Sequence, residues 1–421
     1  MSAAAAVVER RRVSITRTRV LGIVYLLIAA FSMWWYGLQA ESVQDTTFGL
    51  SGGGVEVADL RVPVRVTVIV LAAICAFLGG IQLVRGFGRR TYVVLGVVVG
   101  VFILASLTYA ARGKELNLVA LVNSTILRAV PLTLGAMSGV LCERSGVINI
   151  AIEGMFLAGA FTGSIVGSAA GSLWVGLLAA VLVGALLAWV LAVLAIRYRV
   201  DQIVAGVVIT IFALGITSYL SARILGDPEF QYLNNPGRFQ IMKIPLLGDI
   251  PVLGPILFQN NIFVYLMFIL IVVVHVALFR TRWGLRVRAV GEHPRAADTV
   301  GIRVLFERYR SVLYGGMMAG LGGAFFTLGS VGRFDEGMTA GRGFIALAAM
   351  IFGRWTPVGA FGAALVFGLA DALQSRLAIL GAPIPSEFLL MAPYLATILV
   401  VAGVVGRARP PAADGKPYVK E

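Results

Sequence analysis

The chain has 421 residues, of which 59% are hydrophobic and only 13% are charged. Soluble domains carry about 25% charged residues, so this composition excludes a soluble globular protein and indicates an integral membrane protein. The net charge is +14. The excess of Lys and Arg on the cytosolic side of membrane proteins explains this charge better than a nucleic-acid partner does.

Twelve apolar runs follow one another along the chain. A membrane-spanning helix needs about 20 predominantly apolar residues, whereas a spanning strand needs about 10. The runs are too long for strands, so we predict an all-α, polytopic membrane bundle. Because 148–167 and 341–355 are short, the expected number of spans is ten to twelve. The candidate spans are 20–38, 64–84, 91–110, 118–141, 148–167, 173–196, 202–222, 262–279, 308–328, 341–355, 357–376 and 387–406.

The distribution of positive charge predicts the orientation. With both termini in the cytosol, most of the 35 Lys and Arg fall on the inner side of the membrane, as the positive-inside rule requires. The first apolar run ends in Trp34, Trp35 and Tyr36 instead of a small-residue cleavage site. We therefore expect it to stay as a membrane anchor and not to be removed as a signal peptide.

The chain divides into three predicted parts. Residues 1–116 form a basic tail with three spans, and 117–406 form a Gly- and Ala-rich core with a cytosolic segment at 280–307. Residues 407–421 are polar and are expected to be disordered. Glycines spaced by four residues predict close helix packing; they are Gly96 and Gly100, Gly159, Gly163, Gly167 and Gly171, and Gly316 and Gly320.

An outer loop at 223–261 contains five prolines together with apolar patches. This pattern predicts ordered structure at the outer rim of the bundle. Two interpretations stay open. The loop receives an external binding protein, or it is a lid without a partner.

No recognisable catalytic or metal-binding constellation occurs in the sequence. Cys75 and Cys142 are the only cysteines, and His275 and His293 are the only histidines, at spacings that suit no metal site. No G-x-x-x-x-G-K-[ST] phosphate loop is present. We therefore predict that this chain does not hydrolyse ATP itself and has no cofactor. Uphill transport would then draw its energy from another subunit or from an ion gradient.

Arg280–Val304 is the only long polar stretch between two strongly apolar runs in the C-terminal half. Pro294 suits the first position of a helix and Gly301 the position after its C-cap, so Pro294–Val300 is predicted to form about two helical turns. Ala296 and Ala297 would give this helix a low-relief face that fits a groove. Arg286, Arg288 and Arg295 would supply positive charge around it. The alternative is an ordinary basic loop in the cytosol.

Ionisable groups inside spans cost at least a few kcal/mol unless they are paired or hydrated. Asn149 and Glu153 lie four residues apart, on one helical face, and Asp371 and Gln374 form a similar pair. We assign both pairs to a translocation pathway, with a purely structural role as the alternative. Arg128 is a third intramembrane charge that could pair with one of these acids.

Three segments together resemble one family. Gly284 to Pro294, GLRVRAVGEHP, with Ala296-Ala297 and Gly301-Ile302 after it, resembles the coupling-helix motif of bacterial ABC importer permeases for branched-chain amino acids, simple sugars and nucleosides. Glu143 to Met155, ERSGVINIAIEGM, resembles a signature of the nucleoside and simple-sugar branch, and Gly341–Pro357 resembles a third shared stretch. The resemblance covers roughly residues 117–406 and leaves 1–116 without a counterpart.

The resemblance implies a transport subunit and not an enzyme. Such permeases lie in the bacterial inner membrane and pair as homo- or heterodimers. They bind two ATP-binding cassette subunits and receive their substrate from an extracytosolic binding lipoprotein. The residues that the resemblance assigns to coupling with the ATPase are Arg288, Ala289, Gly291, Glu292, Pro294, Ala296, Ala297 and Gly301.

The 143–155 segment favours nucleosides as substrate, ahead of simple sugars such as ribose and then branched-chain amino acids. A secondary transporter of the major-facilitator type is a rival interpretation, because Gly80 to Arg90, GIQLVRGFGRR, resembles a loop of that family. The acidic residue of that loop would fall near Val84, however, and no second copy is present. A membrane scaffold is the third interpretation. An importer permease co-purifies with a separate ATPase, whereas a secondary transporter works alone with an ion gradient.

Overall fold

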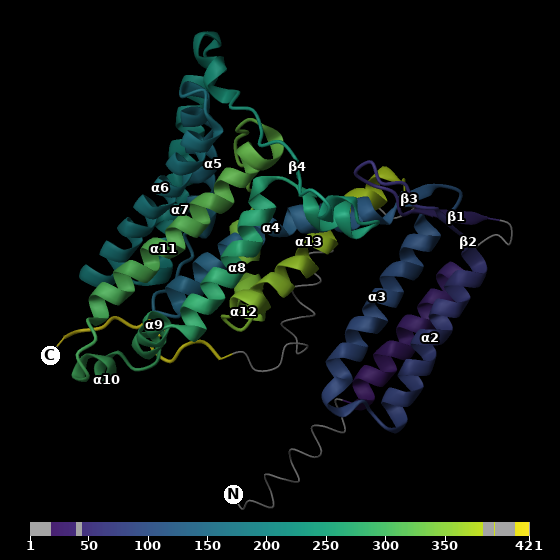
Figure 1. The fold of residues 1–421 in the computed structure, drawn as a ribbon. Helices are drawn as coiled ribbons and strands as arrows, with labels where there is room; N and C mark the ends of the chain where they lie inside the picture. The colour runs from purple at the N-terminus through teal and green to yellow at the C-terminus, as the bar shows by residue number, and fades with distance from the viewer. Residues whose placement is uncertain (1–17, 39–43, 382–390, 392–408, 421) are drawn as a thin grey trace, which may run out of the picture. The chain divides into compact units, whose positions relative to one another are not determined.

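The computed structural model describes residues 18–38, 44–381, 391 and 409–420 (Figure 1). Within these residues, ten helices are long and apolar enough to cross a membrane, which confirms the predicted polytopic helical class. The predicted span 341–355 is wrong, because it contains only the 11-residue helix α12 (Arg342–Phe352). At about 1.5 Å per residue this helix is too short for a hydrocarbon core of about 30 Å. The predicted span 387–406 lies outside the described residues.

Contacts between Cα atoms divide the chain into two compact units. The N-terminal unit comprises Met1–Leu121 and Leu373–Leu390, and the core unit comprises Val122–Ala372 and Met391–Glu421. The domain boundary expected near residue 116 stays a prediction. The helices α4 (Leu118–Glu143) and α13 (Pro357–Ile379) contribute to both units.

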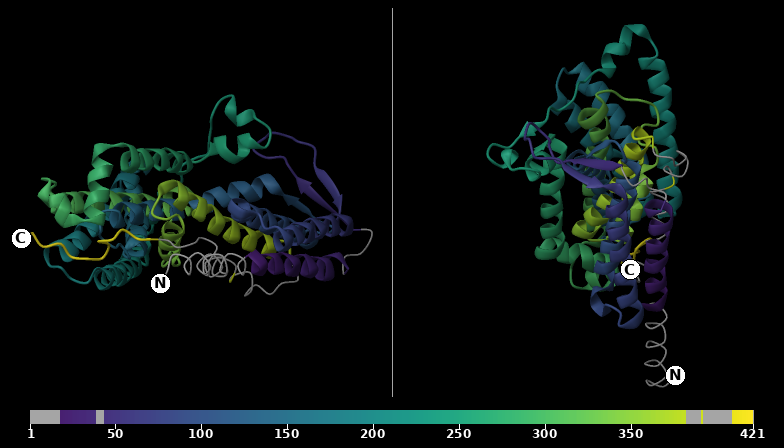
Figure 2. Two further views of the ribbon diagram at one scale, coloured as in Figure 1. Left: turned by 90° about the horizontal axis from the view of Figure 1, so that it is seen from below. Right: turned by 90° about the vertical axis from the view of Figure 1, so that its right-hand side faces the viewer.

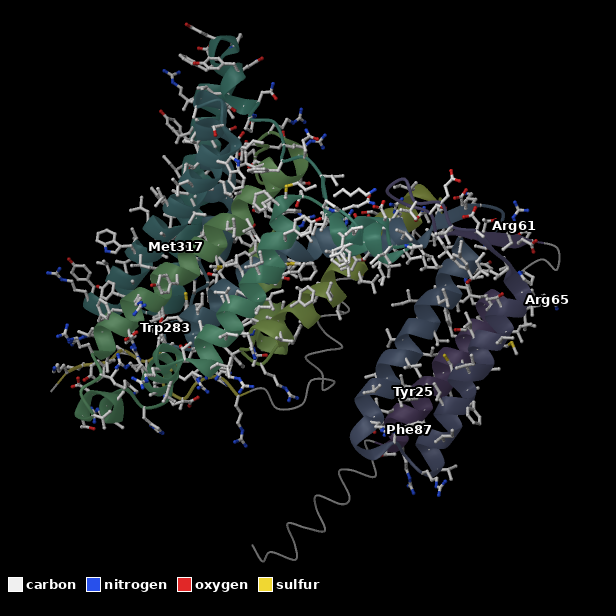
Figure 3. All side chains as sticks on the ribbon, in the orientation of Figure 1. Tyr25, Arg61, Arg65, Phe87, Trp283 and Met317 are labelled. Carbon is white, nitrogen blue, oxygen red and sulfur yellow. The ribbon has the colours of Figure 1, made fainter. Side chains whose placement is uncertain are left out.

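The N-terminal unit contains three helices that run side by side (Figures 1 and 2). They are Thr18–Gly37, which ends in the π-helical turn η1 (Ser32–Gly37), α2 (Val64–Val84) and α3 (Thr91–Ala110), which follows the short η2 (Gly88–Arg90). Tyr25, Cys75 and Val98 are buried between the three helices. Figure 3 shows Arg61 and Arg65 at one end of this helix group and Phe87 at the other.

A small sheet in the N-terminal unit was not predicted. The strands β1 (Asp45–Gly49), β2 (Leu60–Pro63) and β3 (Glu115–Asn117) pair in the order β2-β1-β3. β1 is antiparallel to β2 and parallel to β3. Strands of three to five residues are too short to show a clear alternating pattern, and β3 pairs with a strand far from it in sequence. The sequence therefore predicted only a loop here.

The core unit is built on α5 (Ile152–Ala169), α6 (Leu173–Ala192) and α11 (Val304–Ala324), which pack most closely. α7 (Gln202–Leu220) lies against α5, and α8 (Ile262–Arg280) precedes the polar segment. Three helices continue as π-helical turns: η3 (Val193–Arg197) after α6, η4 (Ser221–Leu225) after α7 and η8 (Phe325–Val331) after α11.

Glycines allow the three central helices to touch through their backbones. A β-carbon on Gly159 would lie 2.7 Å from the carbonyl oxygen of Gly320, and one on Gly176 would lie 2.5 Å from that of Gly163. No side chain fits at such distances, so the predicted packing role is confirmed for these positions of α5 and α11. Gly96, Gly100 and Gly171 differ: a β-carbon on any of them meets no described atom within 4 Å, so the described residues do not bear out the packing role there.

The loop after α7 forms short ordered elements, as predicted. They are η5 (Pro228–Asn234), β4 (Met242–Lys243), η6 (Leu247–Asp249), η7 (Gly254–Phe258) and β5 (Gln259–Asn260), with β4 antiparallel to β5. Asn234 ties the loop to the helices: its Oδ1 accepts hydrogen bonds from Ser164 Oγ (2.8 Å) and from the N–H of Phe334 (2.7 Å).

Replacement of Gly320 by Leu is expected to destabilise the core unit. The added side chain would overlap the backbone of Ala180 and Val181 on α6, and overpacking costs about 1–3 kcal/mol. We expect a lower midpoint of thermal unfolding for the full chain in detergent. Gly100→Leu is the matched control, because its β-carbon would meet open space. Equal midpoints for the two variants would contradict the packing role of Gly320.

Candidate functional site

The polar segment after α8 folds into two short helices, α9 (Arg282–Glu292) and α10 (Pro294–Thr299) (Figure 1). Thr281 caps α9, because its hydroxyl accepts a hydrogen bond from the N–H of Gly284 (3.2 Å). Pro294 occupies the first turn of α10, and Gly301 has a φ of +83° just beyond its end. The predicted short helix is thereby confirmed. α9 was not predicted as a separate helix.

The residues assigned to coupling do not all face the same way. Glu292, Ala296 and Gly301 are exposed, whereas Arg288, Ala289 and Pro294 are half-buried. Gly291 and Ala297 are buried. Ala297 packs in a small cluster with Val290, Val304 and Tyr418. The exposed surface of α10 is therefore formed by Ala296 and its exposed neighbours, and not by both alanines.

Gly291 packs directly on the loop that begins the 143–155 segment. A β-carbon at this position would overlap the carbonyl oxygen of Arg144, so only glycine allows this approach. Arg144 in turn donates hydrogen bonds from Nε to the carbonyl of Trp355 (2.9 Å) and from Nη2 to that of Arg354 (3.3 Å). The structure thus brings together the three segments that carry the family resemblance.

Side chains of the 143–149 loop bind the turn between α12 and α13. Arg354 and Trp355 both adopt left-handed backbone conformations, with φ of +54° and +53°, which cost about 1–2 kcal/mol each for non-glycine residues. Trp355 Nε1 donates a 2.5 Å hydrogen bond to Glu143 Oε2. Burial lowers the pKa of Arg144 and the charge of Glu292 opposes this, but an arginine stays protonated at neutral pH.

The C-terminal segment, residues 409–420, lies against α9 and α10 (Figure 1). Ala413 donates a backbone hydrogen bond to the carbonyl of Gly291 (2.9 Å), and the N–H of Ala412 donates to Glu292 Oε2 (3.1 Å). Tyr418 is buried, and Lys420 forms an ion pair with Asp298 (3.7 Å). The expectation of a disordered tail is wrong for these residues. They dock mainly through backbone hydrogen bonds, which a low hydrophobic content does not reveal.

Asp414 and Arg308 occupy the buried junction between this segment and the helices. Arg308 of α11 is 1% exposed, and its Nη1 donates to the carbonyl of Lys416 (3.0 Å). Gly146, with a φ of +89°, leaves room for the guanidinium group. Burial raises the pKa of Asp414 to about 6, although a hydrogen bond with Glu143, the N–H of Gly415 and the charge of Arg308 all oppose the rise.

Glu153 acts as a clamp between α5 and α12. Its carboxylate accepts hydrogen bonds from Thr339 Oγ1 (2.6 Å), the N–H of Gly341 (2.8 Å) and the N–H of Gly343 (2.6 Å). It therefore caps the N-terminus of α12, where a negative charge is stabilised. Asn149 is fully buried and accepts from the N–H of Ala151 (3.1 Å), which fixes the turn into α5. These contacts support a structural role for Asn149 and Glu153, the first of the two pairs that the sequence assigned to a translocation pathway.

Asp371 sits between two arginines. Its Oδ2 lies 2.6 Å from Arg128 Nη1 and 3.6 Å from Arg342 Nη2, so the expected partnership with Arg128 is confirmed. The Asp371 side chain is 24% exposed, unlike Glu153, which is 6% exposed. Gln374 is half-buried one turn further along α13.

Comparison with known proteins agrees with this arrangement. A family model described as branched-chain amino acid transport system / permease component matches residues 121–405. The chain belongs to this family of permease components. No solved structure matches it significantly.

Several relatives cover most of the permease core. The guanosine ABC transporter permease protein NupQ of Bacillus subtilis is 44% identical over 71% of this chain and 96% of its own length. The nucleoside ABC transporter permease protein NupC of Lactococcus lactis is 37% identical over the same shares. The putative glucose ABC transporter permease protein TsgC13 of Haloferax volcanii is 35% identical over 61% of this chain and 77% of its own length.

Sequence reasoning missed several residues of this permease site. Arg342 gave a signal, because it is a lone Arg beside an apolar run, whereas Arg308 lies in a charged stretch with Glu307 and Arg310. Thr339 and Trp355 gave none, because nothing in their neighbourhood indicates that they bind Glu153 and Glu143. The family model ends at residue 405, so the docked segment 409–420 lies outside the shared pattern.

Docking of the C-terminal segment is expected to depend on pH through Asp414. Its pKa is higher in the docked state than the ordinary value of about 3.9, so docking takes up a proton. Docking should therefore strengthen as pH falls from about 6 toward about 4, and it should be weakest well above about 6, where Asp414 is ionised in both states. A spin label on the exposed Val419 should be less mobile at about pH 5 than at about pH 8. Asp414→Asn should remove most of this difference, and an unchanged pH response in that variant would contradict the assignment.

Proposed function

We propose that the protein is the permease subunit of an ATP-driven importer of nucleosides in the bacterial inner membrane, with both termini in the cytosol. The observation that carries this proposal is the exposed face of α10, fastened to the bundle through the contact of Gly291 with Arg144. A short helix that is exposed on one side and rigidly attached on the other can transmit a movement of a bound subunit to the helix bundle. The partners are two ATP-binding cassette subunits, a second permease chain and an extracytosolic binding lipoprotein.

The contacts provide a route from α10 to the interior. A displacement of α9 and α10 moves the 143–149 loop, because Gly291 leaves no space between them. Arg144 and Glu143 pass the movement to the turn at Arg354 and Trp355, and this turn joins α12 to α13. Two sites that each bias one bistable element are what coupling requires.

The translocation pathway is proposed to run past Asp371. This side chain is partly exposed and lies between Arg128 and Arg342, so it offers both charge signs to a polar substrate. Asn149 and Glu153 brace the helices around the pathway, and Gln374 lies beside it on α13. The loop after α7 is the proposed surface for the binding lipoprotein.

Nucleosides are the preferred substrate class because the relatives named for guanosine and nucleosides match 96% of their own length. A simple sugar is the second candidate, favoured by the 35% identity to a putative glucose permease. The two classes share a sugar ring, so discrimination depends on contacts with the base.

Ala296→Glu is expected to prevent docking of the ATPase, because it places a charge on the exposed face of α10 without disturbing the buried Gly291 and Ala297. We expect at least about tenfold less ATPase to co-purify, since burial of an unpaired charge costs several kcal/mol. Ala170→Glu is the matched control. Ala170 is also exposed, but it lies at the C-terminal end of α5, whereas the 143–149 loop precedes the N-terminal end. This variant should retain the ATPase. Full co-purification and uptake by Ala296→Glu would overturn the docking assignment.

Uptake of labelled guanosine by the complete transporter should be inhibited by other nucleosides and not by ribose or glucose. A site that binds the base leaves its polar groups unpaired with a bare sugar, and this costs about 10⁴-fold in discrimination at the upper end. Competition measured in cells without other nucleoside transporters tests this expectation. Equal inhibition by ribose would favour the sugar permease.

A further inference from the structure

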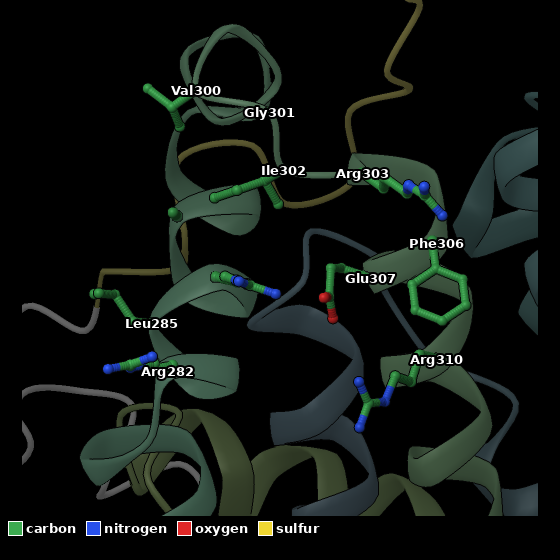
Figure 4. Close-up of a pocket in the computed structure, with 11 residues that line it drawn as sticks. Arg282, Leu285, Val300, Gly301, Ile302, Arg303, Phe306, Glu307 and Arg310 are labelled. Carbon is green, nitrogen blue, oxygen red and sulfur yellow. The ribbon is translucent and has the colours of Figure 1, made fainter.

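A basic cavity of about 710 Å³ lies between α9 and the beginning of α11. Four arginines line it, accompanied by one carboxylate, that of Glu307 (Figure 4). The arginines are Arg282, Arg286, Arg303 and Arg310. Residues 409–420 do not line it.

Most of the positive charge of this cavity has no ion-pair partner in the part of the chain that the structure describes. Among the described residues, no ion pair involves Arg282, Arg286 or Arg303. Arg310 is held by neutral groups: its Nε donates to Tyr314 Oη (3.1 Å), and its guanidinium carbon lies 5.4 Å from the ring centre of Trp283. Glu307 is 5% exposed, and its Oε2 accepts from Trp283 Nε1 (3.0 Å). The cavity therefore carries four guanidinium groups against the single carboxylate of Glu307 and has a net positive charge.

Apolar side chains lie directly beside this charge. Leu285 is 62% exposed and Phe306 is 58% exposed, and both line the cavity. In Figure 4, Glu307 and Arg310 project from α11 into the space beside α9, while Arg303 and Phe306 lie together at the rim. A soluble anion would gain nothing from the apolar rim, whereas a ligand with a charged head and an apolar body would use both.

The position along the chain fits such a ligand. α8 ends at Arg280 and α11 begins at Val304, and both helices are long and apolar enough to span the membrane. The cavity thus lies where two spans leave the hydrocarbon region. Trp283 beside it is a residue type enriched at the membrane surface, and basic pockets between membrane helices on the cytosolic side bind lipid headgroups.

We propose that this cavity binds the phosphate headgroup of an anionic phospholipid from the cytosolic leaflet, with the acyl chains against Leu285 and Phe306. Guanidinium groups bind phosphate through paired N–H donors, so several of them around one cavity match a phosphodiester. The lipid would fasten α9 to the beginning of α11, next to the coupling helix. This inference rests on the proposed orientation, but not on the proposed substrate.

The full chain in phosphatidylcholine nanodiscs, with and without phosphatidylglycerol, tests the site. The measurement is the affinity for phosphatidylglycerol, from native mass spectrometry of the retained lipid. Replacement of Arg282, Arg286 and Arg303 by Gln should weaken binding at least about tenfold, since each basic residue near anionic lipid contributes about 1 kcal/mol. Arg85→Gln, Arg90→Gln and Arg197→Gln together remove the same charge from other positions expected on the cytosolic side, and should leave the affinity unchanged.

Four outcomes would overturn the proposal. Unchanged affinity in the cavity variant would show that the cavity binds no lipid, and an equal loss in the control would show that only surface charge matters. Displacement of the lipid by inorganic phosphate at similar concentration would identify a free anion as the ligand. Loss of ATPase co-purification with unchanged lipid affinity would identify the ATPase as the occupant. The lipid measurement involves no transport, so its failure would leave nucleoside uptake as a separate question.

Discussion

The approach of Gly291 to the carbonyl oxygen of Arg144 is the contact on which the polar end of the core unit depends. It joins α9 to the 143–149 loop without an intervening side chain, so neither can move without the other. Arg144 then holds two carbonyls of the turn after α12, and the N–H of Ala413 binds the carbonyl of Gly291. One glycine thus lies at the meeting point of three parts of the chain.

The central helices form a rigid support for this contact. α5, α6 and α11 touch through glycine backbones, and packed interiors resist gradual deformation. Glu153 fastens the beginning of α12 to α5 through three hydrogen bonds. In the proposed coupling, a movement transmitted through Arg144 would meet the rigid helix group on one side and the turn at Arg354 and Trp355 on the other. That turn already has unfavourable backbone conformations, so it is the natural place for a change of geometry.

The sequence predicted what depends on local pattern. Long apolar runs predicted the spans, Pro294 and Gly301 predicted the ends of α10, and glycine spacing predicted close helix packing without naming which helices touch. What it could not predict depends on pairing between distant residues. The strand β3 pairs with β1 across two spans, and nothing near Thr339 indicates that it binds Glu153. The same limit explains why Gly291 and Ala297 were expected to face a partner although they are buried.

The C-terminal segment lies beside the exposed face of α10, which is the surface proposed for docking of the ATPase. A cavity of about 540 Å³ is lined on one side by Glu292–Ala296 and on the other by Ala412, Ala413 and residues 416–419. An ATPase that docks on the exposed face of α10 therefore meets the C-terminal segment as well. Part of this surface lies beyond residue 405, where the match to the family model ends. Burial raises the pKa of Asp414 to about 6, so its protonation is expected to strengthen the contact of this segment with Gly291 as pH falls.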